Sequence, residues 1–257
     1  MLEFLDRFKV DVACVGNHDF DFGIGPFMRL KEKTSFPWLL SNVKDPKTKE
    51  PLGGCEDHKI VEHDGVKIGL IGLAEEEWLD CVPSFGEDEY EYESFVTVAK
   101  EWCKKFRDDG CELIIALTHM RIKNDKLLAE KVPDLDMILG GHDHFDDEIN
   151  INDVYILKSG TDFREFSIVK VELDCSKSML NNEEEATVID HDKRHMISRE
   201  KVEITREFEP DQEMKEVVDH FWKDLKVQLQ KIAGYTGVNM DATFATIRTQ
   251  EAAISNF

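Results

Sequence analysis

Three stretches of the chain are nearly continuous apolar runs. They are Val10–Gly16 (VDVACVG), Leu113–His119 (LIIALTH) and Leu135–His142 (LDMILGGH). Runs of this kind, without regular polar alternation, are typical of strands that are buried on both faces of a sheet. We therefore predict three strands of one buried sheet, each leading into a histidine-bearing turn.

Amphipathic stretches separate these runs and predict helices that cover the sheet. They are Pro26–Lys33, Ser94–Arg107 with Ser94 as N-cap, and Lys123–Lys131. Asp64-Gly65 is a tight-turn dipeptide and predicts a hairpin. Alternation in Val154–Leu157 and Phe166–Leu173 predicts further antiparallel strands. This succession of strands and helices favours an α/β sandwich over an all-α or all-β fold.

A long amphipathic helix is predicted near the C-terminus. Apolar residues between Asp211 and Ile232 recur with a period of about 3.6 residues, directly after Pro210. The segment after this helix is too short to fold alone, so we expect it to open a further, truncated domain. The polar segment Asn181–Glu185 is predicted to be a loop.

The chain is strongly acidic. Its 257 residues include 54 acidic and 32 basic side chains, which gives a formal net charge of −22 at pH 7. This charge repels polyanions, so we expect no nucleic-acid polymer and no anionic membrane surface as a partner. An anionic substrate would therefore need local positive charge, such as metal ions.

The cysteine pattern favours a reducing compartment. The six cysteines are scattered and form no C-x-x-C pair. No segment approaches the run of about 20 apolar residues that a membrane span needs. We expect a cytoplasmic protein without a membrane segment, and the possibility of a targeting signal upstream of Met1 stays open.

Polar residues follow each of the three predicted strands. Ligands of open α/β sheets bind beyond the carboxyl ends of the strands, so these residues should converge. Asn17 offers a carbonyl oxygen, while His119, His142 and His144 offer imidazole nitrogens, a set suited to Zn, Mn or Fe rather than Ca. A single strand-end histidine is most often an ordinary hydrogen-bonded residue. Three such strand ends at one sheet edge favour a metal site.

Five motifs, in a fixed order along almost the whole chain, carry a more specific signal. They are GNHDFD (Gly16–Asp21), FPWLLSNV (Phe36–Val43), ALTHM (Ala116–Met120), GGHDH (Gly140–His144) and RTQEAAISN (Arg248–Asn256). Together they resemble the calcineurin-like metallophosphoesterases and, within them, the 5'-nucleotidase family. The resemblance implies a metallophosphoesterase-type β-sandwich flanked by helices.

The resemblance also implies roles for the matching residues. Those assigned to metals are Asn17, His119 and His142 for one divalent ion and His144 for a second. His18 would act beside the phosphate as acid or transition-state stabiliser, and Asp21 would orient it. The two metal ions, of the Zn, Mn or Fe class, would clamp the phosphate and activate a water that attacks phosphorus.

The chain departs from the family pattern at its N-terminus. The family places an Asp-x-His and a Gly-Asp before GNHD, which together supply a histidine, an aspartate and the carboxylate that bridges both metals. The residues before Gly16 contain neither motif. We therefore expect a fold that lacks its first strands, with an N-terminally incomplete catalytic domain at 1–206, a linker helix at 207–234 and the start of a truncated nucleotidase-type domain at 235–257.

Two functions of different class remain open. The first is metal-dependent hydrolysis of a small phosphate ester, for which the resemblance suggests a nucleotide. The alternative is a catalytically impaired scaffold with a binding or regulatory role, motivated by the missing carboxylate motifs. A protein phosphatase of the same superfamily is a weaker third reading.

Two further segments have more than one interpretation. The position of Asp143 on a turn favours a solvated turn carboxylate, with support of the metal ligands as the alternative. The run His191–His195 (HDKRH) has a metal-like composition, but its place in an alternating polar segment favours an exposed hairpin.

Overall fold

A computed structural model describes residues 2–79, 86, 89–173 and 195–232, together with single positions between 235 and 246. The chain divides into two compact units, Met1–Phe208 and Glu209–Phe257. Each unit is described by itself. The predicted loop Asn181–Glu185 and the motif Arg248–Asn256 lie outside the described residues.

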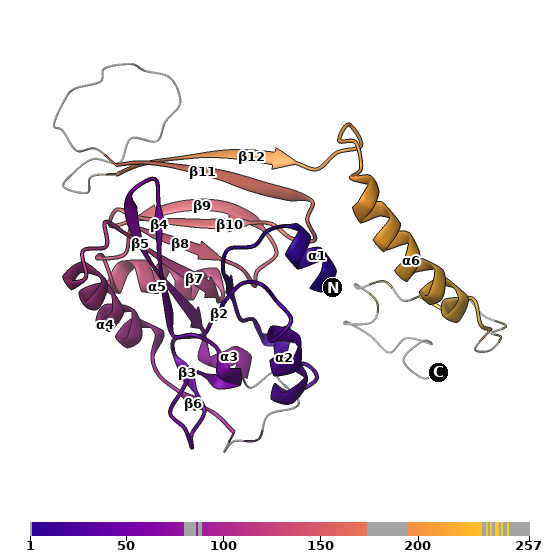
Figure 1. Ribbon diagram of the computed structural model, residues 1–257, viewed down its shortest axis with the longest axis horizontal. Coiled ribbons are helices and arrows are strands. Elements are labelled where there is room, and N and C mark those ends of the chain that lie inside the picture. The colour runs from indigo at the N-terminus through magenta and orange to yellow at the C-terminus, as the bar shows by residue number, and fades with distance from the viewer. Residues whose placement is uncertain are drawn as a thin grey trace. The chain divides into compact units, whose positions relative to one another are not determined.

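A six-stranded sheet forms the centre of the first unit, with strand order β4-β5-β7-β8-β10-β9 (Figure 1). The strands are β4 (His58–His63), β5 (Val66–Ala74), β7 (Leu113–His119), β8 (Met137–Gly140), β9 (Asp146–Ile151) and β10 (Val154–Ser159). The four inner strands are mutually parallel, and β4 and β9 pair antiparallel at the two edges. The carboxyl ends of the inner strands therefore meet at one edge of the sheet.

The apolar runs explain most of this sheet. Strand β7 has the predicted bounds Leu113–His119, and β8 lies inside the predicted run Leu135–His142. The predicted hairpin is confirmed, because Asp64 and Gly65 connect β4 to β5 with φ angles of 50° and 81°. Two positive φ values in a two-residue turn match the twist of the flanking strands.

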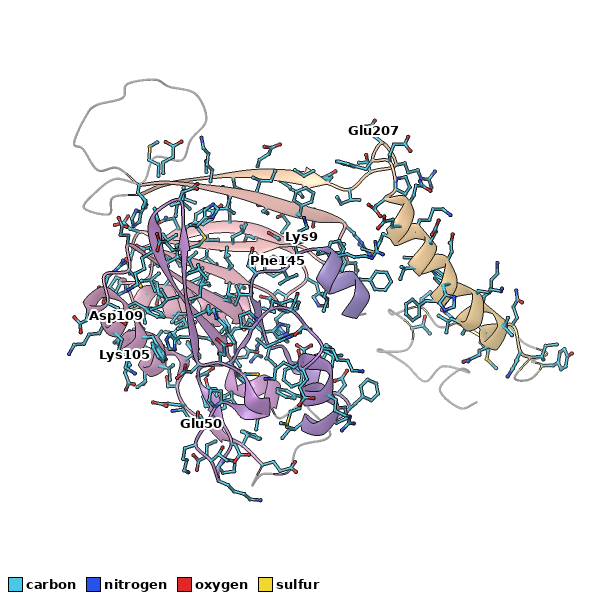
Figure 2. All side chains as sticks on the ribbon, in the orientation of Figure 1. Lys9, Glu50, Lys105, Asp109, Phe145 and Glu207 are labelled. Carbon is cyan, nitrogen blue, oxygen red and sulfur yellow. The ribbon has the colours of Figure 1, made fainter. Side chains whose placement is uncertain are left out.

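Helices α4 (Phe95–Asp108) and α5 (Ile122–Lys131) confirm two of the predicted helices, and their apolar faces form the main core with the sheet. Fully buried Phe106 and Leu128 are part of this core. Lys105 and Asp109 lie on the outer side of α4 (Figure 2). Ser94 occupies the N-cap position of α4, but its side chain makes no capping hydrogen bond.

The hairpin of β11 (Glu165–Leu173) and β12 (His195–Glu203) contacts the other face of the sheet. The contact is apolar and includes Val169, Val171 and Ile197 from the hairpin. Hollows of about 400 and 540 Å³ lie between the hairpin and the sheet. The prediction of further antiparallel strands is confirmed. His195 is the described part of the run His191–His195, and its side chain is only 10% exposed, so it is not an exposed hairpin residue.

The N-terminal segment forms a second, smaller core. Its main elements are α1 (Leu2–Arg7), β1 (Ala13–Cys14), α2 (Ile24–Lys31) and β2 (Trp38–Leu39). Five short elements, η1, β3, η2, α3 and β6, accompany them. Those short elements span Asn17–Phe20, Val43–Lys44, Leu52–Gly54, Glu76–Leu79 and Glu91–Tyr92. Helix α2 confirms the third predicted helix, two residues earlier than expected.

The first apolar run corrects one prediction. Only Ala13 and Cys14 of Val10–Gly16 form a strand, and this strand pairs with β2 rather than joining the six-stranded sheet. The reason is that Val15 packs into the smaller core with the aromatic residues Phe20 and Phe27, so the run is buried by side chains instead of by neighbouring strands. The prediction of an α/β fold is confirmed.

The second unit contains α6 (Gln212–Leu229), which confirms the predicted long helix. Asp211 caps it, because its Oδ1 accepts a hydrogen bond from the Met214 amide at 2.7 Å. Of the described helices, none has both the length and the hydropathy needed to cross a membrane.

Candidate metal centre

His119 lies at the last position of β7, and its imidazole ring packs between Gly16 and Gly141. A Cβ atom on Gly16 would lie 2.8 Å from the imidazole Nδ1 of His119, and one on Gly141 would lie 3.3 Å from the same atom. Any side chain at Gly16 would collide with the ring. These glycines therefore serve to let backbone approach the imidazole from both sides.

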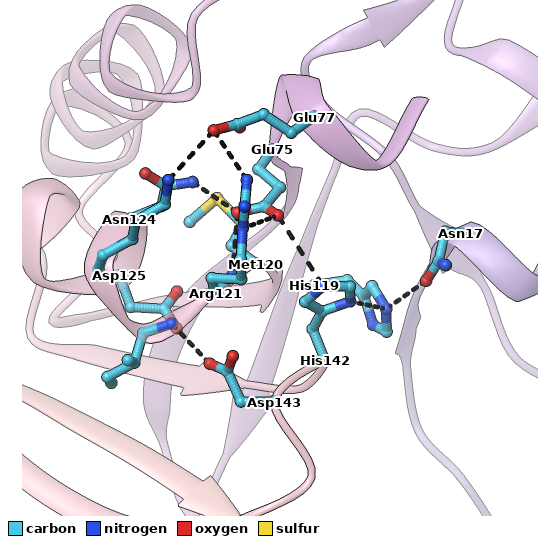
Figure 3. A network of polar contacts seen from close by, with 12 residues as sticks. Asn17, Glu75, Glu77, His119, Met120, Arg121, Asn124, Asp125, His142 and Asp143 are labelled. Atoms are coloured by element: carbon cyan, nitrogen blue, oxygen red, sulfur yellow. Dashed lines mark hydrogen bonds and ion pairs between the residues drawn. The ribbon is translucent and has the colours of Figure 1, made fainter. Parts of the chain in front are cut away.

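Three potential ligand atoms converge at this edge of the sheet (Figure 3). Asn17 Oδ1 lies 2.8 Å from His119 Nε2, and His119 Nε2 lies 3.1 Å from His142 Nδ1. Asn17 begins η1, His119 ends β7, and His142 lies two residues after the parallel strand β8. The structure thus brings together three residues that the sequence assigned to one metal ion.

Both imidazoles of this group are held neutral. Burial lowers the pKa of His119 to about 4, helped by the positive charge of Lys158 and by His142. Burial also lowers the pKa of His142, against the opposing effect of Glu75. A neutral imidazole has a free lone pair, which is the form that binds a metal.

Glu75 is a buried carboxylate that the sequence prediction missed. It directly follows β5, and its side chain is 1% exposed. It accepts hydrogen bonds from the Arg121 amide at 3.0 Å, Arg121 Nε at 2.6 Å and Asn124 Nδ2 at 2.5 Å. Its Oε1 lies 3.9 Å from His142 Nε2, the ring nitrogen opposite the one that faces His119. Glu75 thus lies behind His142 at a distance too long for a hydrogen bond, and its charge opposes the lowering of the pKa of His142 (Figure 3).

The same strand-end rule that singled out the histidines would have found Glu75. The apolar run VKIGLIGLA ends directly before it, and β5 pairs in parallel with β7 up to the register Ala74 with His119.

His18 and Asp21 form a separate pair on the short helix η1. Nδ1 of His18 lies 2.9 Å from Asp21 Oδ2, and their side chains are 78% and 44% exposed. The contact with Asp21 occupies Nδ1 and leaves Nε2 of His18 accessible. An exposed, oriented imidazole is suited to contact a substrate.

His144 is exposed and stands apart from the convergent group. It follows His142 by two residues, and both adopt left-handed backbone conformations, with φ of 60° and 76°. In the described part of the chain no hydrogen bond or ion pair joins His144 to Asn17, His119 or His142, although its charge is among the causes that lower the pKa of His119. Its role as a ligand of a second ion stays a prediction.

Asp143 lies between these two histidines and is not a solvated turn residue. Its side chain is 15% exposed. Its Oδ2 accepts a hydrogen bond from the Ile122 amide at 2.5 Å and lies 3.2 Å from Lys158 Nζ. The interpretation as a solvated turn carboxylate is therefore wrong. Asp143 instead stabilises the turn that carries His142 and His144.

The donor set fits one transition-metal ion better than a complete two-metal site. An amide oxygen and two neutral imidazole nitrogens suit Zn, Mn or Fe. Within the described ranges, no three His, Cys, Asp or Glu side chains are grouped as a metal site. The carboxylate of Glu75, which lies 3.9 Å from His142, is already engaged by Arg121 and Asn124.

Comparison with known proteins places this arrangement in context. A family model described as calcineurin-like phosphoesterase matches residues 1–146. The chain is 25% identical over 292 aligned residues to the trifunctional nucleotide phosphoesterase protein YfkN of Bacillus subtilis, covering 100% of this chain and 19% of that protein. It is 32% identical over 155 residues to a 5'-nucleotidase of Vibrio cholerae, covering 54% of this chain and 27% of that one. The chain thus spans about a quarter or less of these relatives.

Solved structures share the fold. A 5'-nucleotidase precursor from Thermus thermophilus superposes with a TM-score of 0.76 at 19% identity, covering 99% of this chain and 51% of that one. The calcineurin-like phosphoesterase YfkN from Bacillus subtilis superposes with a TM-score of 0.70 at 18% identity, covering 90% and 75%. At such identities the likeness concerns the fold alone.

Proposed function

The chain belongs to the calcineurin-like phosphoesterase family, and we propose that it serves metal-dependent hydrolysis of phosphate esters, with nucleotides as the substrate class. The family resemblance inferred from the motifs is thereby confirmed. The observation that carries the proposal is the convergence of Asn17 Oδ1, His119 Nε2 and His142 Nδ1 at one sheet edge. The nucleotide substrate class is supported by the names of the relatives.

In this proposal, Asn17, His119 and His142 hold one divalent ion and His144 contributes to a second. When bound, such ions polarise the phosphoryl group and activate a water for attack on phosphorus. The protein keeps the two partly buried imidazoles neutral and confines the ring of His119 by the glycines around it.

His18 has a different role in the proposal. Its Nδ1 is bound to Asp21, which fixes the tautomer and the orientation of the ring. Nε2 then contacts the phosphate ester, either to protonate the leaving oxygen or to stabilise the charge that develops on the phosphoryl group.

The test measures release of phosphate from p-nitrophenyl phosphate and from a nucleoside monophosphate, with Mn²⁺ or Zn²⁺ added to the purified chain. His18→Ala should lower turnover by about 10²- to 10⁴-fold, as expected for loss of a general acid. His119→Ala should abolish metal-stimulated activity. His63→Ala is the matched control, because His63 is exposed on the β4–β5 hairpin, and it should keep wild-type activity. Full activity in both site variants would refute the proposal.

A binding or regulatory scaffold is the second candidate. It is favoured by the engagement of Glu75 with Arg121 and Asn124, because this carboxylate is then not free to bridge two ions. This alternative predicts at most one metal ion per chain and no turnover. Elemental analysis that finds two tightly bound ions per chain would exclude it.

A further inference from the structure

Lys158 is a buried cation close to the two histidine turns. It lies in β10, and its side chain is 2% exposed. A buried ammonium is costly unless acceptors surround it. Two carboxylates do so, since Asp125 Oδ2 lies at 2.7 Å from Nζ and Asp143 Oδ2 at 3.2 Å.

The other two partners of Lys158 are backbone carbonyls. Nζ donates to the carbonyl of Met120 at 2.6 Å and to the carbonyl of Gly141 at 2.6 Å. Met120 directly follows His119, and Gly141 directly precedes His142. One ammonium group, with three protons to donate, therefore ties together the two turns that carry the convergent histidines.

Asp125 holds Lys158 in this place. It is fully buried in α5 and also accepts a hydrogen bond from Thr118 Oγ1 at 2.7 Å. The pair packs against the end of β8, where a Cβ on Gly140 would lie 2.9 Å from Asp125 Oδ2 and 3.0 Å from Lys158 Nζ. A residue with a side chain at position 140 would therefore displace this pair.

We propose that Lys158 is a positioning residue that sets the spacing and orientation of His119 and His142 through the carbonyls of Met120 and Gly141. The idea rests on the proposed function in so far as these histidines bind metal. The physical role is nevertheless local, because Lys158 donates hydrogen bonds to the backbone of both turns, in addition to the effect of its charge on the pKa of the two imidazoles. It acts on the ligands by fixing the chain from which they project.

The first part of the experiment measures Mn²⁺ and Zn²⁺ affinity by isothermal titration calorimetry. Lys158→Met keeps the length of the side chain but removes its charge and its donors. To avoid an unpaired buried carboxylate, the double variant Lys158→Met/Asp125→Asn is measured beside it. Both should bind metal about 10- to 100-fold more weakly than wild type, as is usual for groups that orient ligands. Lys201→Met, which removes the ion pairs of β12 with Asp146 in β9 and with Glu165 in β11, should bind as wild type does.

The second part measures amide hydrogen exchange without metal. In the double variant, exchange should accelerate in the segments around Met120 and His142 and stay unchanged in β4. This readout separates the two ideas. If wild type binds no metal but these two segments loosen, the proposed function fails and the positioning role stands. If metal affinity and exchange in the folded double variant both equal those of wild type, Lys158 has no positioning role.

Discussion

Two networks of buried charge lie at opposite ends of β8, and each is built around an aspartate. At the start of the strand, Asp136 is 2% exposed. It accepts from Arg107 Nη2 and from the Ile114 amide, each at 2.7 Å, and His195 Nε2 lies at 3.4 Å. Burial by itself would raise the pKa of Asp136, but these three partners together lower it.

At the far end, Asp125 responds in the opposite way. Burial raises its pKa to about 6, although Lys158 and Thr118 both contact it. The difference lies in how each cation is used. Arg107 gives its donors to Asp136 and to nearby carbonyls of its own corner, whereas the single ammonium of Lys158 is divided between Asp125 and the carbonyls of two histidine turns.

The comparison teaches that burial of an ion pair does not reveal its purpose. Asp136 joins α4, β7 and β12 at the end of the sheet opposite the candidate metal centre. There its interactions stabilise the fold. The Lys158 network leaves its aspartate poorly compensated and uses the cation to hold ligand-bearing turns. Such a site sacrifices stability for geometry.

The largest effect that would sharpen this contrast is expected at Asp136. Asp136→Ala leaves Arg107 and the Ile114 amide without their shared acceptor, and it should lower the free energy of unfolding by about 3 kcal/mol. Urea denaturation measures this loss. Metal affinity of the folded variant should equal that of wild type, and a loss below about 1 kcal/mol would contradict the structural role.

The second effect concerns pH. Asp125 has a folded pKa of about 6 against an ordinary value of 3.8, so the folded state binds the extra proton between these values and stability falls as pH rises through this window. Asp125→Asn removes this penalty. Its stability relative to wild type should rise by about 2–3 kcal/mol between pH 4 and pH 6 and stay constant above pH 6.

The readout is the difference in the free energy of unfolding between Asp125→Asn and wild type at each pH. The difference is used because His119 changes the pH dependence of stability with the opposite sign, and it does so equally in both proteins. Its pKa is lowered to about 4, so its contribution to stability grows as pH rises from about 4 to 6.5. Asp136 has a lowered pKa, so its contribution is present above its ordinary value and is lost only at lower pH. A constant difference between wild type and Asp125→Asn from pH 4 to 7 would remove the proposed contrast.

The smallest effect is expected at Glu75. Glu75→Gln keeps the size of the side chain but weakens its pull on His142 Nε2, and it should lower Mn²⁺ or Zn²⁺ affinity about tenfold, close to 1.4 kcal/mol. Glu77→Gln is the control, because Glu77 contacts the same Arg121 at 2.7 Å but is 50% exposed. Equal effects of both substitutions in titration calorimetry would assign the role to Arg121 instead.

Much of the fold could be predicted because a long apolar run must be buried, and a central strand of a covered sheet is one of the few places that bury it. Leu113–His119 is buried from both faces and pairs on both sides, so its bounds follow from its composition. The run Val10–Gly16 looks the same in sequence, yet the structure buries it against aromatic side chains. Hydrophobicity predicts burial, but it does not tell which neighbours provide it.

The site was predictable where strand ends carry histidine, and less so elsewhere. Lys158 was missed although it interrupts the apolar run VYILKS, and a lysine there can be stable only if acceptors meet it. Those acceptors are the backbone carbonyls of Met120 and Gly141. Every residue has such a carbonyl, so the sequence does not indicate which ones meet the lysine. The position of His144 depends on two left-handed residues in one turn, and single-residue backbone conformations of this kind cannot be deduced from composition.

The two glycines that flank His119 also have an entropic consequence. A side chain that is free to rotate must give up that freedom when a ligand captures it, and the loss subtracts from affinity. The His119 ring has given up part of it already, because backbone at Gly16 and Gly141 packs so closely on the ring that a Cβ would lie 2.8 and 3.3 Å from its Nδ1. That part of the ordering cost therefore falls on the folding of the chain. Capture of an ion by this ring then requires less further loss of rotational freedom.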